Sequence, residues 1–155
     1  MELVAVQSEK KSVLANLLEY YVYEFSPYLH IDVNEEGKYG FDKVEEYVES
    51  EQYSSYFIMV ENQYAGFVIV KIEKDGPFNY SIEQFFVLNR YNGKGIGKKA
   101  AIEIFNRYRG KWQITQTETN YHAQAFWRGV IKGYTKNEFI EKYDEKRRSV
   151  QLFTN

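Results

Sequence analysis

The fold follows from one segment, Tyr80-Ser-Ile-Glu-Gln-Phe-Phe-Val-Leu-Asn-Arg-Tyr-Asn-Gly-Lys-Gly-Ile-Gly-Lys-Lys-Ala100. Its apolar first half predicts a strand, and its end predicts the start of a helix. Three glycines occupy alternate positions between them: Gly93, Gly95 and Gly97. Glycines leave backbone N–H groups uncovered, and such groups at the start of a helix bind anions. Because positive charge surrounds them at Lys94, Lys98 and Lys99, the segment predicts a site for a phosphate-bearing cofactor.

Length and composition indicate one domain that spans residues 1–155. Hydrophobic residues make up 44% of the chain, which is enough for a core. The chain has no cysteine, which excludes disulfides, thiolate metal sites and a cysteine nucleophile, and we expect a cytoplasmic location. A formal net charge of −2 argues against a general nucleic-acid binder.

Metal and membrane sites are not favoured either. The chain has only two histidines, His30 and His122, and we predict no metal site. No apolar run approaches the roughly 20 residues that a membrane span needs. Since the N-terminus also lacks the basic region of a signal peptide, we expect no association with a membrane.

The apolar spacing predicts a mixed α/β domain with the order β-α-α-β-β-β-α-β-α-β-β. The first helix carries an apolar stripe from Val13 to Phe25, and Ser26-Pro27 is predicted to end it. A second helix is expected from Asp42, after a polar loop over residues 28–40. The other elements are expected as strands at 3–6, 56–60, 66–72, 80–88 and 112–117, a helix after the glycines, a helix capped by Asn120, and a hairpin of 137–143 with 149–153.

Three phosphate-binding motifs compete for the glycine turn. A P-loop needs four residues between its first glycine and a Gly-Lys-Ser/Thr end, but Asn92 stands at the first position and Lys99 at the last. A dinucleotide fingerprint needs G-x-G-x-x-G after the first strand of a βαβ unit. Here the spacing is G-x-G-x-G, and the preceding strands form a meander. The third motif, an acyl-coenzyme A turn, is implied by a family resemblance that two segments of the chain carry.

Two segments carry a resemblance to a known family: Phe85-Phe-Val-Leu-Asn-Arg-Tyr-Asn-Gly-Lys-Gly-Ile-Gly97 and Asn120-Tyr-His-Ala-Gln-Ala-Phe-Trp127. From the strand at Tyr56 to the C-terminus, the chain resembles the Gcn5-related N-acetyltransferase (GNAT) superfamily. The resemblance implies a single-domain α/β GNAT fold, with a mixed, mostly antiparallel central sheet flanked by about four helices. It also implies that an acetyl group moves from acetyl-CoA to a primary amine by direct attack on the thioester.

The resemblance assigns the glycine turn to the cofactor. The pyrophosphate would lie on the N–H groups from Gly93 to Lys98, and the pantetheine arm would pair with the strand edge from Phe86 to Leu88. That pairing requires the strand at 112–117 to splay away. The cofactor-binding residues that the resemblance implies are Phe86, Val87, Leu88, Asn92, Gly93, Lys94, Gly95, Ile96, Gly97, Lys98, Asn120 and Trp127.

The chain departs from the family pattern at two of these positions. Asn92 replaces the usual Arg or Gln, which weakens one side-chain contact to the pyrophosphate that Lys94 or Lys98 can offset. Trp127 replaces a frequent Tyr, and an indole cannot act as a general acid at neutral pH. A catalytically silent acyl-CoA-binding module therefore stays open as an alternative, as does an interaction module whose acceptor is a protein.

The catalytic residues must first remove a proton, because an amine with a pKa of about 10.4 is almost wholly protonated at pH 7. Many GNAT members use a glutamate two residues before Phe86, where this chain has Gln84. We therefore predict that the adjacent Glu83 is the base, with a solvated strand-edge charge as the alternative interpretation. Tyr121 and Tyr134 are candidate proton donors.

The first two helices and their loop are expected to bind the acceptor. Glu24, Tyr28 and Asp32 combine carboxylates with an aromatic ring, which suits a cationic amine through charge and cation–π contact. We predict a small polyamine-like, amino-acid-like or aminoglycoside-like acceptor. The same carboxylates could equally be surface charges or helix caps, and the sequence leaves a homodimer open.

Overall fold

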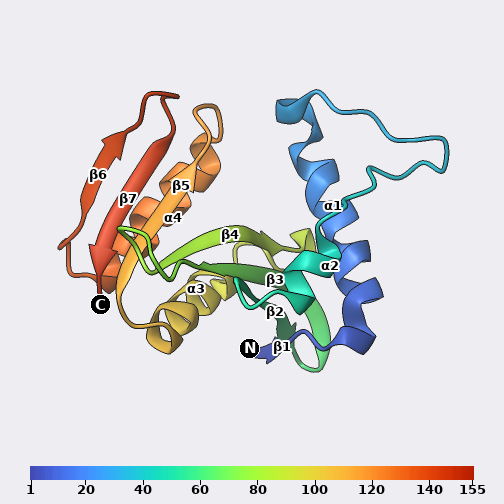
Figure 1. Ribbon diagram of the computed structural model, residues 1–155, viewed down its shortest axis with the longest axis horizontal. Helices are drawn as coiled ribbons and strands as arrows, with labels where there is room; N and C mark the ends of the chain where they lie inside the picture. The colour runs from blue at the N-terminus through green and yellow to red at the C-terminus, as the bar shows by residue number, and fades with distance from the viewer.

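A mixed sheet forms the centre of the molecule (Figure 1). The computed structural model describes residues 1–155, except for the side chain of Leu29. Its strands are β1 (Glu2–Ala5), β2 (Tyr53–Val60), β3 (Gln63–Ile72), β4 (Tyr80–Val87), β5 (Lys111–Gln116), β6 (Ile140–Tyr143) and β7 (Ser149–Thr154). Its α-helices are α1 (Lys11–Leu29), α2 (Val44–Glu49), α3 (Ile96–Arg107) and α4 (Tyr121–Tyr134), with 3-10 turns at Ser8–Lys10 and Asn89–Tyr91. The predicted order of elements is confirmed.

The strands follow the order β1-β2-β3-β4-β5-β7-β6. Every neighbouring pair is antiparallel except β4 and β5, which are parallel. The helices cover both faces, since α1 and α2 share one apolar cluster with the sheet while α3 and α4 share the other. Figure 1 shows α1 and α2 on the right, and α4 with the β5–β7–β6 half of the sheet on the left. The predicted fold class is therefore confirmed.

The parallel pair β4–β5 opens soon after it begins. The two strands are paired only at Tyr80 with Trp112 and at Ser81 with Gln113. Beyond these positions β5 continues to pair with β7 on its other side, while the facing edge of β4 has no strand beside it. The splay that the family resemblance requires is thus present.

A β-bulge in β4 marks the same region. On the β3 side, Gln84 pairs with Ile69 and Ile82 pairs with Val70, so that Glu83 has no partner in the register. A bulge bends its strand and re-aims the side chain of the extra residue. The candidate base therefore occupies an irregular position of β4, next to the opening.

Near the end of β4, the backbone of β3 approaches very closely at Gly66. A Cβ atom at Gly66 would lie 2.0 Å from the carbonyl oxygen of Phe86, which no side chain tolerates. Glycine at this point lets the two strands stay paired up to Val87.

The predicted end of the first helix is wrong, because α1 continues through Pro27 to Leu29. A proline inside a helix removes the N–H that would reach the carbonyl four residues earlier, here that of Tyr23. The hydroxyl of Ser26 donates to this carbonyl oxygen at 2.8 Å instead, and the N–H of His30 closes the last turn on Ser26 at 3.0 Å. The side chain before the proline thus supplies the missing donor.

Candidate active site

The opening between β4 and β5 leads into two cavities. The outer cavity has a volume of about 520 Å³ and lies beside the glycine turn. The inner cavity, of about 250 Å³, lies between the separated strands. Both are lined by Phe25, Phe85, Asn120, Ala123 and Trp127. Together they form one cleft that runs from the turn into the sheet.

The glycine turn forms the mouth of this cleft. Gly93 and Gly95 have φ angles of +75° and +73°, which other residues adopt only at a cost. Gly95 is the N-cap of α3, and among the described side chains none caps this helix and none in its first turn is acidic. The first N–H groups of α3 are therefore left for an anion, which the helix dipole also favours.

The lysines of the turn differ in their surroundings. Lys98 lines the outer cavity, together with Ile96 and Gly97. Lys94 lies over the ring of Tyr91, with 5.7 Å between its Nζ and the ring centroid. Lys98 is therefore the lysine that borders the helix N-terminus and the cavity at once.

A hydrogen-bonded row connects the turn to α1. Asn92 donates through Nδ2 to Oδ1 of Asn89 at 2.9 Å, and Asn89 donates through its own Nδ2 to Oε1 of Glu24 at 2.7 Å. The structure thus brings Glu24, which the sequence predicts at the acceptor site, into contact with the 3-10 turn that follows β4. Asn92 itself lines the outer cavity.

Strand β4 and helix α4 supply the walls. Val87 lines the outer cavity, whereas Phe86 is buried in the cluster with α1. Leu88 lies just past the strand and its N–H donates to the carbonyl of Ala65 at 2.8 Å. The carbonyl of Leu88 accepts the N–H of Tyr91 at 2.8 Å, so both of its backbone groups are engaged within the protein. Of the predicted strand residues, Val87 therefore faces the cleft with its side chain, and Phe86 could contribute only through the backbone.

Asn120 and Trp127 lie where α4 borders both cavities. Asn120 caps α4 as predicted, because its Oδ1 accepts the N–H of Ala123 at 3.1 Å. Its Nδ2 is then the group that it can offer to a ligand. Trp127 is 5% exposed and packs edge-on against Phe85, with 5.0 Å between ring centroids. It forms an apolar wall.

Glu83 faces a buried tyrosine of α2. The Tyr47 hydroxyl donates to Oε1 of Glu83 at 3.1 Å and accepts from Nε2 of Gln84 at 3.2 Å. Burial raises the pKa of Tyr47 well above its ordinary value, and the Glu83 charge adds to the increase. The hydroxyl therefore stays protonated and keeps donating. Burial and the same charge raise the pKa of Tyr21 to about 12.

Several predicted residues do not line the cleft: Glu24, Lys94, Tyr28, Asp32 and Tyr121. Tyr121 is 71% exposed and lines a separate cavity with Glu118, Tyr143 and others. Tyr28 is exposed near the end of α1, and Asp32 is exposed in the loop that follows. Neither lines the inner or the outer cavity.

A cavity beside α1, which we call the third cavity, borders the loop between α1 and α2. It has a volume of about 350 Å³ and is lined by Tyr21, Val22, Ile31, Tyr39, Gly40, Phe41, Asp42 and Gln84. The loop over it is anchored because the Glu19 carboxylate accepts the N–H groups of Tyr39 and Gly40 at 2.7 and 2.9 Å. Tyr21 and Gln84 also line the inner cavity, so the two cavities are neighbours.

Among the described residues, no group of three or more His, Cys, Asp or Glu side chains is placed to hold a metal ion. None of the described helices combines the length and hydropathy needed to cross a lipid bilayer.

Known structures share this fold. An acetyltransferase from Thermus thermophilus aligns with a TM-score of 0.70 and 12% identity, over 97% of this chain and 94% of its own. A GNAT acetyltransferase from Staphylococcus aureus aligns with a TM-score of 0.64 and 12% identity, over 99% of this chain and 98% of its own. The aminoglycoside acetyltransferase AAC(6′)-Ib in complex with coenzyme A aligns with a TM-score of 0.64 and 16% identity, over 99% of this chain and 94% of its own.

Sequence comparison identifies the family. No curated protein is similar enough in sequence to match the chain. The model of the Acetyltransferase (GNAT) family, however, matches residues 15–130. This match covers most of α1, the bulged strand β4, the glycine turn and most of α4. The chain belongs to the GNAT family of acetyltransferases.

Proposed function

We propose that the chain is an N-acetyltransferase that uses acetyl-CoA to acetylate a primary amine of a small cationic molecule. The observation that carries this proposal is the cleft between β4 and β5, which joins the glycine turn to Glu83 through two neighbouring cavities. Coenzyme A in the similar structure of AAC(6′)-Ib supports the choice of cofactor.

The chain offers a suitable group for each part of the cofactor. The N-terminus of α3 and Lys98 would hold the pyrophosphate. The free edge of β4 at Phe86 and Val87 and the Nδ2 of Asn120 would bind the amides of the arm. When bound, the cofactor supplies an acetyl group activated as a thioester.

Glu83 would act as the base. Glu83 lines the inner cavity at the bulge of β4, where its carboxylate would take a proton from the ammonium group of the acceptor, directly or through water. Tyr47 would orient the carboxylate by donating to one of its oxygens. Trp127 would exclude water from the apolar wall. Tyr121, being outside the cleft, has no contact there that supports a role as proton donor.

The third cavity favours a cationic acceptor. Asp42 supplies a carboxylate, and Tyr21, Tyr39 and Phe41 supply aromatic rings, a combination that binds ammonium groups through charge and cation–π contact. The cavity adjoins the inner one at Gln84. An amine bound there could reach the region of Glu83.

Calorimetric titration with acetyl-CoA, followed by release of free thiol in the presence of amines, tests the proposal. The amine panel would contain polyamines, amino acids and aminoglycosides. We expect saturable binding and thiol release with at least one amine. Binding without thiol release for any amine would favour a silent acyl-CoA-binding module, and absence of binding would overturn the proposal.

The variant Glu83→Gln tests the assignment of the base. We expect kcat to fall by about 10²- to 10⁴-fold while the affinity for acetyl-CoA stays the same. Glu61→Gln, in the exposed turn between β2 and β3, is the matched control. An unchanged kcat in Glu83→Gln would show that the base is elsewhere.

A further inference from the structure

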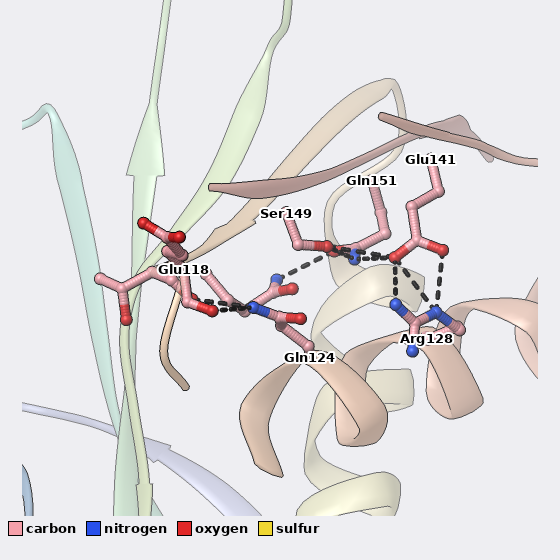
Figure 2. Close-up of polar contacts among 8 residues, drawn as sticks. Glu118, Gln124, Arg128, Glu141, Ser149 and Gln151 are labelled. Carbon is pink, nitrogen blue, oxygen red and sulfur yellow. Dashed lines mark hydrogen bonds and ion pairs between the residues drawn. The ribbon is translucent and has the colours of Figure 1, made fainter. Parts of the chain in front are cut away.

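A row of polar side chains runs across β6, β7 and β5, from the partly exposed Arg128 to Gln116 at the inner cavity. Figure 2 shows Arg128, Glu141, Ser149 and Gln151 of this row. Arg128 of α4 binds Glu141 of β6 through two nitrogens, with Nε to Oε2 and Nη2 to Oε1 distances of 2.8 Å each. Gln151 of β7 donates through Nε2 to Oε1 of Glu141 at 3.0 Å. Gln116, at the end of β5, donates through Nε2 to Oε1 of Gln151 at 2.9 Å.

The carboxylate at the outer end fixes the direction of the whole row. Arg128, with the help of Gln151 and Ser149, lowers the pKa of Glu141 to about 2, so this group is ionised and can only accept. Gln151 must therefore point its NH₂ group to Glu141 and its oxygen to Gln116. Gln116 must in turn donate a hydrogen bond from its NH₂ group to that oxygen. The group left at the inner end is an acceptor, the Oε1 of Gln116.

This oxygen has no partner. Gln116 is 5% exposed, and among the described residues its Oε1 is the only buried side-chain nitrogen or oxygen without a hydrogen bond. A buried acceptor without a donor is costly and calls for an explanation. Because the row fixes the orientation of the amide, rotation of Gln116 cannot relieve the cost.

The position of Gln116 indicates where the donor comes from. Gln116 lines the inner cavity together with Phe85 of β4, on the part of β5 that no longer pairs with β4. The oxygen itself exposes less than 1 Å², so a ligand between the two strands reaches it once it has displaced the side chains that cover it. Such a ligand can be bonded from both sides. β4 offers its backbone edge, while Gln116 adds one acceptor on the side of β5.

We propose that Gln116 accepts a hydrogen bond from an amide N–H of the pantetheine arm, and that the row from Arg128 holds its carbonyl in the receiving orientation. This inference rests on the proposed use of acetyl-CoA. It adds a cofactor-binding residue on β5, on the strand across from the edge of β4.

The test compares two probes by calorimetric titration: coenzyme A, and 3′-phospho-ADP, which lacks the arm. In Gln116→Met, we expect the Kd for coenzyme A to rise about tenfold, which corresponds to about 1.4 kcal/mol, and the Kd for 3′-phospho-ADP to stay the same. Gln124→Met is the matched control, because Gln124 is equally buried at 5% but donates to the carbonyls of Thr117 and Glu118.

A second variant keeps the test valid if Gln116→Met does not fold. Gln116→Met also leaves Oε1 of Gln151 without its donor, whereas Gln116→Met combined with Gln151→Met removes both partners of that bond. Glu141 then loses the donor from Gln151 but keeps those from Arg128 and Ser149. The same selective loss of coenzyme A affinity is expected. Unchanged affinity for coenzyme A, or equal weakening for both probes, would overturn the inference. A wild-type protein that binds no coenzyme A would instead defeat the proposed function itself.

Discussion

The hydroxyl of Tyr47 lies 3.1 Å from Oε1 of Glu83 and donates a hydrogen bond to it. Tyr47 is 1% exposed and belongs to α2, whereas Glu83 occupies the bulge of β4. A short helix that packs on the sheet thus determines how the candidate base is oriented.

Removal of this hydroxyl should slow turnover without affecting the cofactor. In Tyr47→Phe, we expect kcat to fall about tenfold because the carboxylate loses its orientation, and the free energy of unfolding to fall by about 1 kcal/mol. Steady-state kinetics and urea denaturation measure the two effects. Tyr64→Phe, in the same apolar cluster, controls for loss of a tyrosine hydroxyl, and a normal kcat in Tyr47→Phe would contradict the orienting role.

Binding of the pyrophosphate should depend on the conformation of Gly95. Alanine at a φ of +73° costs about 1–2 kcal/mol, so we expect Gly95→Ala to shift the turn and to weaken binding of coenzyme A in calorimetric titration. Gly129→Ala is the contrasting change, because Gly129 lies inside α4 and a Cβ added to it would meet no atom within 4 Å. It should stabilise the protein by about 0.5–1 kcal/mol and leave the affinity unchanged. Equal affinities in both variants would contradict the assignment of the turn.

Two aspartates of the loop between α1 and α2 should differ in their effect on acceptor binding. Asp42 lines the third cavity, whereas Asp32 is exposed outside the cleft. We expect Asp42→Asn to raise the KM for a cationic acceptor about tenfold, with no change in the KM for acetyl-CoA. Asp32→Asn and Glu24→Gln were expected from the sequence to act in the same way, so measuring all three decides between the two locations. A larger effect in Asp32→Asn would place the acceptor away from the third cavity.

Stability should depend on pH through Glu141. Its pKa is about 2 in the folded protein, against an ordinary value of 4.5. Because the folded pKa is depressed, the stabilisation by Glu141 is complete above about pH 4.5 and is lost as the pH falls toward 2. The difference in free energy of unfolding between wild type and Glu141→Gln should therefore shrink over this range. Urea denaturation at a series of pH values measures it, and a constant difference would contradict the prediction.

Local sequence signals predicted the elements around the cleft. The spacing of Gly93 and Gly95 indicated a turn into a helix, and Asn120 indicated a helix cap; both are present. These features depend on residues within a few positions of one another, so a single segment contains the information. The end of α1 was missed because the hydroxyl of Ser26 compensates for Pro27, a detail that a general rule about proline does not include.

Contacts between distant segments could not be predicted in this way. Tyr47 and Glu83 are 36 positions apart, and nothing local to either residue indicates the other. Gln116 did have a local signal, since it follows Trp112 and Ile114 at inward positions of an alternating strand. Its missing hydrogen-bond partner, however, becomes visible only when β5, β6 and β7 lie side by side.

The short pairing of β4 with β5 has a mechanical consequence. Only two residue pairs join the halves of the sheet, and the rings of Tyr80 and Trp112 lie 5.2 Å apart at that junction. Phe105 adds an edge-on contact to Trp112, with 5.0 Å between centroids. Aromatic packing of this kind tolerates small displacements that a ladder of hydrogen bonds would resist. We therefore expect that a change of ring size at Tyr80 or Trp112 would alter the width of the cleft, although neither residue lines it.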